Sequence, residues 1–149
     1  MDFLEISLKN QGGENLKLSD YKGKWLLLYF YPKDDTPGCT KQACALREQK
    51  TKWDEKNIKI FGVSKDSPKS HQKFIEKYGL NFDLISDESE ELCKFFDVLK
   101  QKQMYGKTYL GIERSTFLID PNGKVVKEWR KVDPETHEQL VWEEFLKHQ

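Results

Sequence analysis

The segment 25–39 constrains the fold more than any other part of the chain. Residues Trp25–Tyr31 (WLLLYFY) are apolar without alternation, which is typical of a strand covered on both faces. Pro32 cannot donate to a strand ladder, so the strand ends before it. Pro37-Gly38 then breaks the chain before a helix that begins near Cys39. A buried strand that leads through a short loop into a helix predicts an α/β fold.

Cys39 lies in the first turn of this predicted helix. The N–H groups of a first turn have no partner within the helix, and the helix dipole is positive at this end, so both favour an anion. The thiolate is the nucleophilic form of cysteine, and this position stabilises it. We therefore interpret Cys39 as a nucleophile; the alternative is a small buried apolar residue, as most free cysteines are.

Pro32, Thr36 and Cys39 follow the spacing Pro-x-x-x-Thr-x-x-Cys. This spacing resembles the active-site motif of the peroxiredoxins. Cys44, five residues after Cys39, and the segment Glu113–Asp120 (ERSTFLID) narrow the resemblance to the bacterioferritin comigratory protein, or peroxiredoxin Q, subgroup. The likeness covers nearly the whole chain.

The resemblance implies a thioredoxin-like fold, with a central mixed sheet flanked by helices, and a thiol-dependent peroxidase. In such an enzyme the Cys39 thiolate attacks the O–O bond of hydrogen peroxide or an organic hydroperoxide and becomes a sulfenic acid. Cys44 is then the resolving residue, which condenses with the sulfenic acid to form an intramolecular disulfide. Thioredoxin or a similar dithiol would reduce that disulfide by exchange. No metal, flavin or haem is required.

Three further residues complete the predicted site. By resemblance, Arg114 matches the arginine that donates hydrogen bonds to the thiolate and the peroxide. Thr36 is placed to aim its hydroxyl at the sulfur or at a peroxide oxygen, and Pro32 to shield the thiolate from water. The alternative for Arg114 is an ordinary surface arginine, and the alternative for Cys44 is a residue that packs the helix.

Two other residues of reactive type are assigned to packing. Cys93 lies beside the apolar positions of its predicted helix, so we expect a structural role. His71 shares one helix face with Phe74, Ile75 and Tyr78. We therefore expect a packed or partly buried imidazole and not a catalyst.

The composition narrows the class of protein. A length of 149 residues predicts one domain, 1–149. The 25 basic and 25 acidic residues cancel, so no overall field attracts nucleic acid or an anionic membrane. No apolar run is long enough for a membrane span and no signal-peptide pattern is present, so we expect a cytoplasmic protein, and a monomer. Three cysteines and three scattered histidines favour a redox cysteine over a disulfide framework or a metal site.

Strand and helix patterns alternate along the chain. Segments 3–8 and 15–18 suggest a short N-terminal hairpin at a sheet edge. A helix over about 39–56 connects the first central strand to a parallel neighbour, Ile58–Val63, in a right-handed βαβ unit. Ser67 is expected to cap a helix that runs to about Tyr78.

The second half begins with a short strand, 82–85. Asp87 is expected to cap the next helix, whose apolar side comprises Leu92, Phe95, Phe96 and Leu99. Residues 100–113 are polar and show no period, so we predict a long loop, often a functional feature. Strands 115–120 and 124–129 flank an Asp-Pro-Asn-Gly turn and should form an antiparallel hairpin. Pro134 should open a C-terminal helix.

Two rival functions are compatible with the same fold. A thioredoxin-like disulfide reductase expects Cys-x-x-Cys, whereas Cys39 and Cys44 have four residues between them. A non-catalytic binding module or holdase would use the aromatic surface. Peroxide consumption by Cys39→Ser distinguishes this holdase from the two enzymes.

The spacing of Cys39 and Cys44 sets a geometric condition on any disulfide between them. Five residues place two helical side chains about 140° apart around the axis and about 7.5 Å apart along it. Bridged cysteines need Cα atoms within about 7 Å and side chains that point together. The first turns of the helix must therefore unwind before the two sulfurs can bond.

Overall fold

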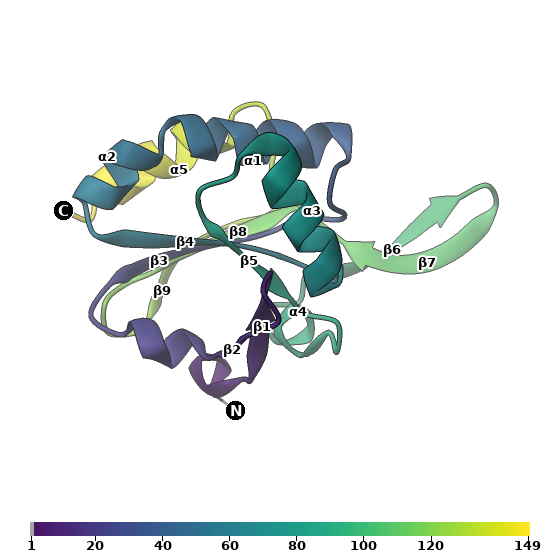
Figure 1. Cartoon of the computed structure of the whole chain (residues 1–149), viewed down its shortest axis with the longest axis horizontal. Coiled ribbons are helices and arrows are strands. Elements are labelled where there is room, and N and C mark those ends of the chain that lie inside the picture. Colours follow the sequence, from purple (N-terminus) through teal and green to yellow (C-terminus); the bar gives the residue numbers. More distant parts are fainter. Residues whose placement is uncertain (1) are drawn as a thin grey trace.

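A computed structural model describes residues 2–149, which form one mixed sheet with helices on both faces (Figure 1). The order of its seven strands is β2-β1-β5-β4-β3-β8-β9. The central strands β3, β4 and β5 are parallel, and β1 and β8 pair antiparallel at either side of them. The strands of this sheet are β1 (Leu8–Asn10), β2 (Asn15–Leu16), β3 (Trp25–Phe30), β4 (Ile58–Ser64), β5 (Asp83–Ser86), β8 (Ser115–Ile119) and β9 (Val125–Trp129).

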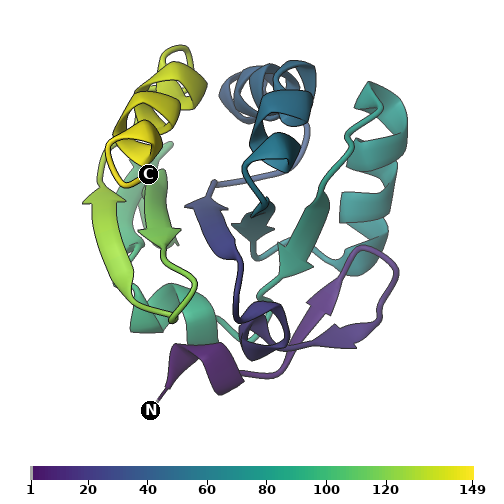
Figure 2. The same cartoon turned by 90° about the vertical axis from the view of Figure 1, so that its left-hand side faces the viewer.

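Four helices cover one face of the sheet, as the turned view shows (Figure 2). They are α1 (Pro37–Glu48), α2 (Lys50–Glu55), α3 (Pro68–Tyr78) and α5 (His137–Leu146). The opposite face is covered by α4 (Glu91–Phe95) and the 3-10 helices Phe3–Glu5 and Leu18–Tyr21. The predicted fold class, a mixed sheet flanked by helices, is confirmed, and β1 and β2 form the expected N-terminal hairpin.

Strand β3 divides the two halves of the core. Leu27 and Tyr29 belong to the cluster under α1, whereas Leu28 and Phe30 belong to the cluster under α4. All four are at most 1% exposed. A strand buried on both faces has no polar alternation, which explains the apolar run in the sequence.

Several predicted boundaries are wrong. The helix expected over 39–56 is two helices, because the backbone of Gln49 leaves the helical region between α1 and α2. The last helix begins at His137 and not at Pro134, which lies in the preceding turn. The N-terminal segment 3–8 begins with a 3-10 helix, Phe3–Glu5, and contributes only Leu8 to a strand.

Helix α4 is also shorter than expected. It ends at Phe95, which is 45% exposed, so the predicted apolar side does not extend to Leu99. Glu90 is the cap residue, although the Asp87 carboxylate accepts from the amides of residues 92 and 93 at the helix start. By contrast, the Ser67 hydroxyl caps α3 by accepting from Ser70 N, as predicted.

The long loop predicted over 100–113 is a β-hairpin. Strands β6 (Leu99–Met104) and β7 (Lys107–Ile112) pair antiparallel and project from the body of the protein (Figure 1). Tyr105 and Gly106 join them, both with positive φ, as a tight two-residue turn requires. Most of its side chains are exposed or half-buried, so no apolar period marked these strands in the sequence.

Candidate active site

The local sequence places Cys39 in the first turn of α1. Thr36 is extended (φ −99°, ψ 156°) and caps the helix, and Pro37 takes the first helical position. The first helical hydrogen bond runs from Thr40 N to Thr36 O, 2.8 Å. Cys39 is 1% exposed. The predicted place of Cys39 in the first turn is therefore confirmed, and the positive end of α1 faces a buried sulfur.

Arg114 reaches this sulfur from the connection between β7 and β8. Its Nη1 lies 3.3 Å from Cys39 Sγ and donates to Gln42 Oε1 at 2.8 Å. The Arg114 carbonyl accepts from Val132 N, which fixes the backbone below the guanidinium. Arg114 is therefore half-buried against Cys39, and its role in the site stays a prediction. Gln42 was not identified from the sequence, although its position one turn after Cys39 on the same helix face was a usable signal.

Gly38 leaves the space that the guanidinium needs. A Cβ atom at this position would lie 3.0 Å from Arg114 Nη2 and 3.4 Å from Pro134 Cγ. A larger residue would therefore force Arg114 or Pro134 to shift. The glycine of the Pro37-Gly38 pair is thus explained by the approach of the arginine.

Thr36 and Pro32 lie at a cavity beside the helix start. The Thr36 hydroxyl donates to Lys33 O at 2.9 Å, so its lone pairs are free to accept a hydrogen bond from a ligand. One of the two predicted orientations had the Thr36 hydroxyl pointing at the Cys39 sulfur. The structure differs, because this hydroxyl donates to Lys33 O. The cavity has a volume of about 310 Å³, and the hairpin contributes one wall through Lys102, Met104, Tyr109, Leu110, Gly111 and Ile112.

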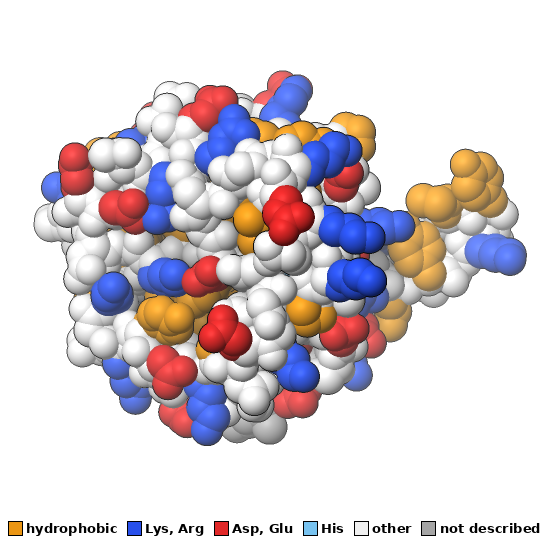
Figure 3. Space-filling model, viewed as in Figure 1, with side chains coloured by type: hydrophobic (Ala, Val, Ile, Leu, Met, Phe, Trp, Pro, Cys, Tyr) orange, Lys and Arg blue, Asp and Glu red, His pale blue; other side chains and the backbone are white. Residues whose placement is uncertain are grey.

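The hairpin that forms this wall carries exposed apolar side chains. Figure 3 shows hydrophobic side chains gathered on the projecting hairpin, with a basic side chain near its tip. Met104 is 56% exposed, Tyr105 97% and Leu110 58%. The hairpin therefore brings apolar surface to the entrance of the cavity that Pro32 and Thr36 line.

Buried polar groups lie close to Cys39 and Arg114. Burial, and then the negative charge of Cys39, raises the pKa of Tyr29 well above its usual range. Burial, and then the nearby Arg114, lowers the pKa of His137 to about 3. Both side chains are therefore neutral near pH 7. Tyr29 Oη and His137 Nδ1, like Gln42 Nε2, make no hydrogen bond within residues 2–149.

The other two cysteines have different surroundings. Cys44 is partly exposed on α1, in the helix that also carries Cys39, and all three cysteines are free thiols. Cys93 is fully buried in the cluster on the opposite face of the sheet from Cys39. Burial, with Asp87 as the next cause, raises the pKa of the Cys93 thiol. The packing role expected for Cys93 agrees with this position.

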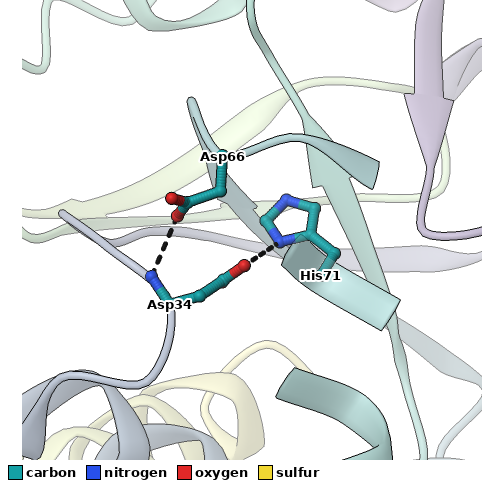
Figure 4. A group of neighbouring side chains, drawn as sticks. All are labelled: Asp34, Asp66 and His71. Carbon is teal, nitrogen blue, oxygen red and sulfur yellow. Dashed lines mark hydrogen bonds and ion pairs between the residues drawn. The ribbon is translucent and has the colours of Figure 1, made fainter. Parts of the chain in front are cut away.

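One cluster among residues 2–149 has the residue types of a metal site. Ligand atoms of Asp34, Asp66 and His71 lie within 4.8 Å of one another (Figure 4). Hydrogen bonds already engage these side chains, because Asp34 pairs with His71 and Asp66 accepts from Ser64 Oγ. The donor set is thus satisfied without a cation.

Comparison with known proteins identifies the family. The model of the AhpC/TSA family matches residues 2–128. The chain belongs to the AhpC/TSA family. Peroxiredoxin Bcp of Bacillus subtilis is 53% identical over 89% of this chain and 85% of its own length. Peroxiredoxin Bcp of Escherichia coli K12 is 40% identical over 97% of this chain and 92% of its own length.

Solved structures agree with this assignment. The bacterioferritin comigratory protein of Xanthomonas campestris superimposes with a TM-score of 0.93 at 46% identity, over 98% of this chain and 93% of that one. Peroxidoxin BcpB of Mycobacterium tuberculosis has a TM-score of 0.80 at 29% identity, over 91% and 87%. This peroxiredoxin is therefore a thiol-dependent peroxidase with a thioredoxin-type fold. None of its helices, within residues 2–149, is long and apolar enough to cross a membrane.

Proposed function

We propose that this peroxiredoxin reduces hydrogen peroxide and organic hydroperoxides with Cys39 as the attacking thiolate. The observation that carries the proposal is the 3.3 Å approach of Arg114 Nη1 to Cys39 Sγ. A guanidinium beside the sulfur stabilises the thiolate and can donate to a peroxide oxygen at the same place. The start of α1 adds the positive end of its dipole.

The first step transfers one oxygen atom to the sulfur. The thiolate attacks the terminal oxygen of the hydroperoxide, the O–O bond breaks, and the leaving alkoxide or hydroxide takes a proton to become alcohol or water. Cys39 then carries a sulfenic acid. The Thr36 hydroxyl, which donates to Lys33 O, can accept the hydroperoxide O–H, and Arg114 can donate to the oxygen that gains charge.

The second step forms a disulfide within the chain. The Cys44 sulfur displaces water from the Cys39 sulfenic acid, and a Cys39–Cys44 bond results. Thioredoxin or a similar dithiol then reduces this bond by thiol–disulfide exchange. A reducing compartment such as the cytoplasm keeps cysteines as thiols and so suits this cycle.

Two observations support organic hydroperoxides as substrates beside hydrogen peroxide. The cavity at Pro32 and Thr36 has a wall made by the hairpin, including Met104, Tyr109 and Leu110, which offers apolar contact to an alkyl group. In addition, structures of the related Xanthomonas campestris protein concern its alkyl peroxide reduction activity.

The test is single-turnover peroxide consumption by cysteine variants. Cys39→Ser should consume no peroxide, while Cys44→Ser should consume one equivalent and accumulate a sulfenic acid that a carbon nucleophile traps at Cys39. Cys93→Ser is the matched control and should turn over with thioredoxin like the parent. Turnover that fails in Cys93→Ser but survives in Cys44→Ser would assign the resolving role to Cys93.

A further inference from the structure

The loop between β3 and α1 is tied to α3 by a buried carboxylate. Asp34, 8% exposed, makes three hydrogen bonds through its side chain. Tyr31 Oη donates to Oδ1 at 2.5 Å, and Ser70 Oγ and His71 Nδ1 lie 2.8 and 2.7 Å from Oδ2. Burial, and then the charge of Asp34, raises the pKa of Tyr31, so the phenol stays a donor. Ser70 and His71 of α3, and Tyr31 directly after β3, thus all bond to the Asp34 side chain.

Hydrogen bonds at both ring nitrogens hold the His71 imidazole in one orientation. The ring is fully buried, and its Nε2 lies 3.0 Å from Ile85 O in β5. A carbonyl can only accept, so Nε2 carries a proton and donates. The other ring nitrogen, Nδ1, faces the Asp34 carboxylate (Figure 4). A proton between Nδ1 and this carboxylate completes a second hydrogen bond of the buried ring.

The backbone of the same loop is fixed as well. Asp34 N donates to Asp66 Oδ2 at 2.9 Å. The next residue, Asp35, has a φ of 57°, an uncommon conformation for a residue other than glycine. Its carboxylate accepts from Lys77 Nζ and Tyr78 Oη of α3 at 2.8 and 2.7 Å. The two residues of the bend before Thr36, Asp34 and Asp35, are therefore both hydrogen-bonded to α3.

We propose that His71 is a positioning residue of the peroxidase reaction and acts through Asp34. The contact fixes the bend that sets Thr36 and the start of α1, and so holds Cys39 at its distance from Arg114. Within residues 2–149, no hydrogen bond joins His71 to Cys39 or to Arg114. The proposal rests on the proposed role of Cys39 as nucleophile, and it goes beyond the packing role that the sequence indicated for His71.

Two substitutions separate the two hydrogen bonds of His71. The amide nitrogen of Asn is as many bonds from Cα as Nδ1, so His71→Asn can still donate to Asp34 but loses Ile85. The amide nitrogen of Gln corresponds to Nε2, so His71→Gln can still donate to Ile85 O but loses Asp34. Both variants remove one buried hydrogen bond, so we expect similar losses of thermal stability in the two.

The readout is the second-order rate constant for oxidation of Cys39 by hydrogen peroxide in a single turnover, measured beside the thermal midpoint. We expect His71→Asn to stay within about threefold of the parent and His71→Gln to fall by about tenfold or more, because small misplacements of reacting groups cost that much. Phe74→Leu, on the same face of α3, is the matched control that lowers stability without removing a hydrogen bond of His71 or Asp34. It should leave the rate constant unchanged.

Equal rate constants in His71→Asn and His71→Gln, or an equally slow Phe74→Leu, would overturn the proposal and leave a structural role. If a His71 variant does not fold, Asp34→Ala tests the contact from the loop side. Asp34→Ala should be slow, with partial recovery in Asp34→Asn, and a parental rate in Asp34→Ala would also overturn the proposal. Failure of Cys39 as the nucleophile is distinguishable, because Cys39→Ser would then still consume peroxide.

Discussion

Arg114 Nη1 lies 3.3 Å from the sulfur of Cys39, although 75 residues separate the two in the chain. Two neighbouring strands bring these residues together. Cys39 follows β3, and Arg114 precedes β8, which pairs antiparallel with β3. The fold thus brings a cation to a helix start that already favours an anion.

This relationship predicts a large effect of removing the guanidinium. Arg114→Ala should lower kcat/KM for peroxide by about 10²-fold or more, the usual cost of losing a donor to charge that develops in the transition state. Steady-state turnover with thioredoxin and single-turnover oxidation should both show the loss. Arg130→Ala is the control, because Arg130 donates to Asp97 O and Glu128 and not to the site. Equal losses in both variants would mean that the wrong arginine has been chosen.

A substitution at Gly38 should displace the Arg114 guanidinium without removing it. A Cβ at Gly38 would lie 3.0 Å from Arg114 Nη2, so Gly38→Ala should push the guanidinium away from the sulfur. The expected result is a slower reaction, by about threefold to tenfold, with no loss of thermal stability, because Ala favours a helix over Gly by about 1 kcal/mol. Peroxide kinetics and a thermal melt on one preparation test this. A parental rate constant would show that the site relaxes around the methyl group.

His137 should make the folded state sensitive to acid. Its pKa is lowered from 6.5 to about 3 by burial and Arg114, so the unfolded chain binds a proton that the folded chain does not. Stability from this group is therefore complete above about pH 6.5 and is lost as the pH falls, by up to about 1.4 kcal/mol per pH unit. Denaturant unfolding at pH 7 and pH 5 should give a smaller difference for His137→Gln than for the parent. An unchanged difference would contradict the assignment.

The hairpin predicts a distinction between substrates. Leu110 lines the cavity with Thr36 and is 58% exposed, so it is available to an alkyl group but not required by hydrogen peroxide. Leu110→Gln should raise KM for an organic hydroperoxide such as cumene hydroperoxide by about threefold to tenfold, the loss expected for apolar contact at one side chain. The rate with hydrogen peroxide should stay the same. Leu140→Gln, at an exposed leucine on α5, is the control.

The parts of the site that could be predicted from the sequence are those encoded locally. The apolar strand and the place of Cys39 in the first turn follow from neighbouring residues, although the helix begins at Pro37 and not after Pro37-Gly38 as predicted. Arg114 was found only by resemblance, because no local pattern shows which distant cation approaches a sulfur. Gln42 was missed although its position one turn after Cys39 was a local signal.

The role of His71 and the β6–β7 hairpin could not be predicted from the sequence. The partner of His71 is distant in the chain, and most side chains of the hairpin face solvent. Periodicity placed His71 on the buried face of α3 beside Phe74, but it could not show Asp34, 37 residues away, as its partner. The hairpin formed by β6 and β7 has largely exposed side chains and therefore gives no apolar alternation. Its Tyr105-Gly106 turn was the signal that was available, since glycine suits the positive φ found there.

The final prediction concerns the unwinding of α1 after oxidation. Cys39 and Cys44 both lie in α1, and an intact helix keeps the two side chains too far apart to bond. The segment between them is anchored at both ends. Asp34 and Asp35 are bonded to α3 before it, and after it Arg47 Nη1 donates to Tyr78 O while Asn81 Nδ2 donates to Arg47 O.

Unwinding should therefore stay between these anchors, in residues 36–46. Peroxide treatment should give an intramolecular Cys39–Cys44 disulfide by mass spectrometry, together with a loss of helical circular dichroism. Amide hydrogen exchange should become faster across residues 37–46, while α3 and the second half of the protein keep their protection. Cys44→Ser is the control, because it can be oxidised at Cys39 but cannot form the bond, so its exchange should remain slow. Detection of the disulfide with unchanged exchange in α1 would show that the geometric argument is wrong, and a disulfide between two chains would show that Cys44 is not the local partner.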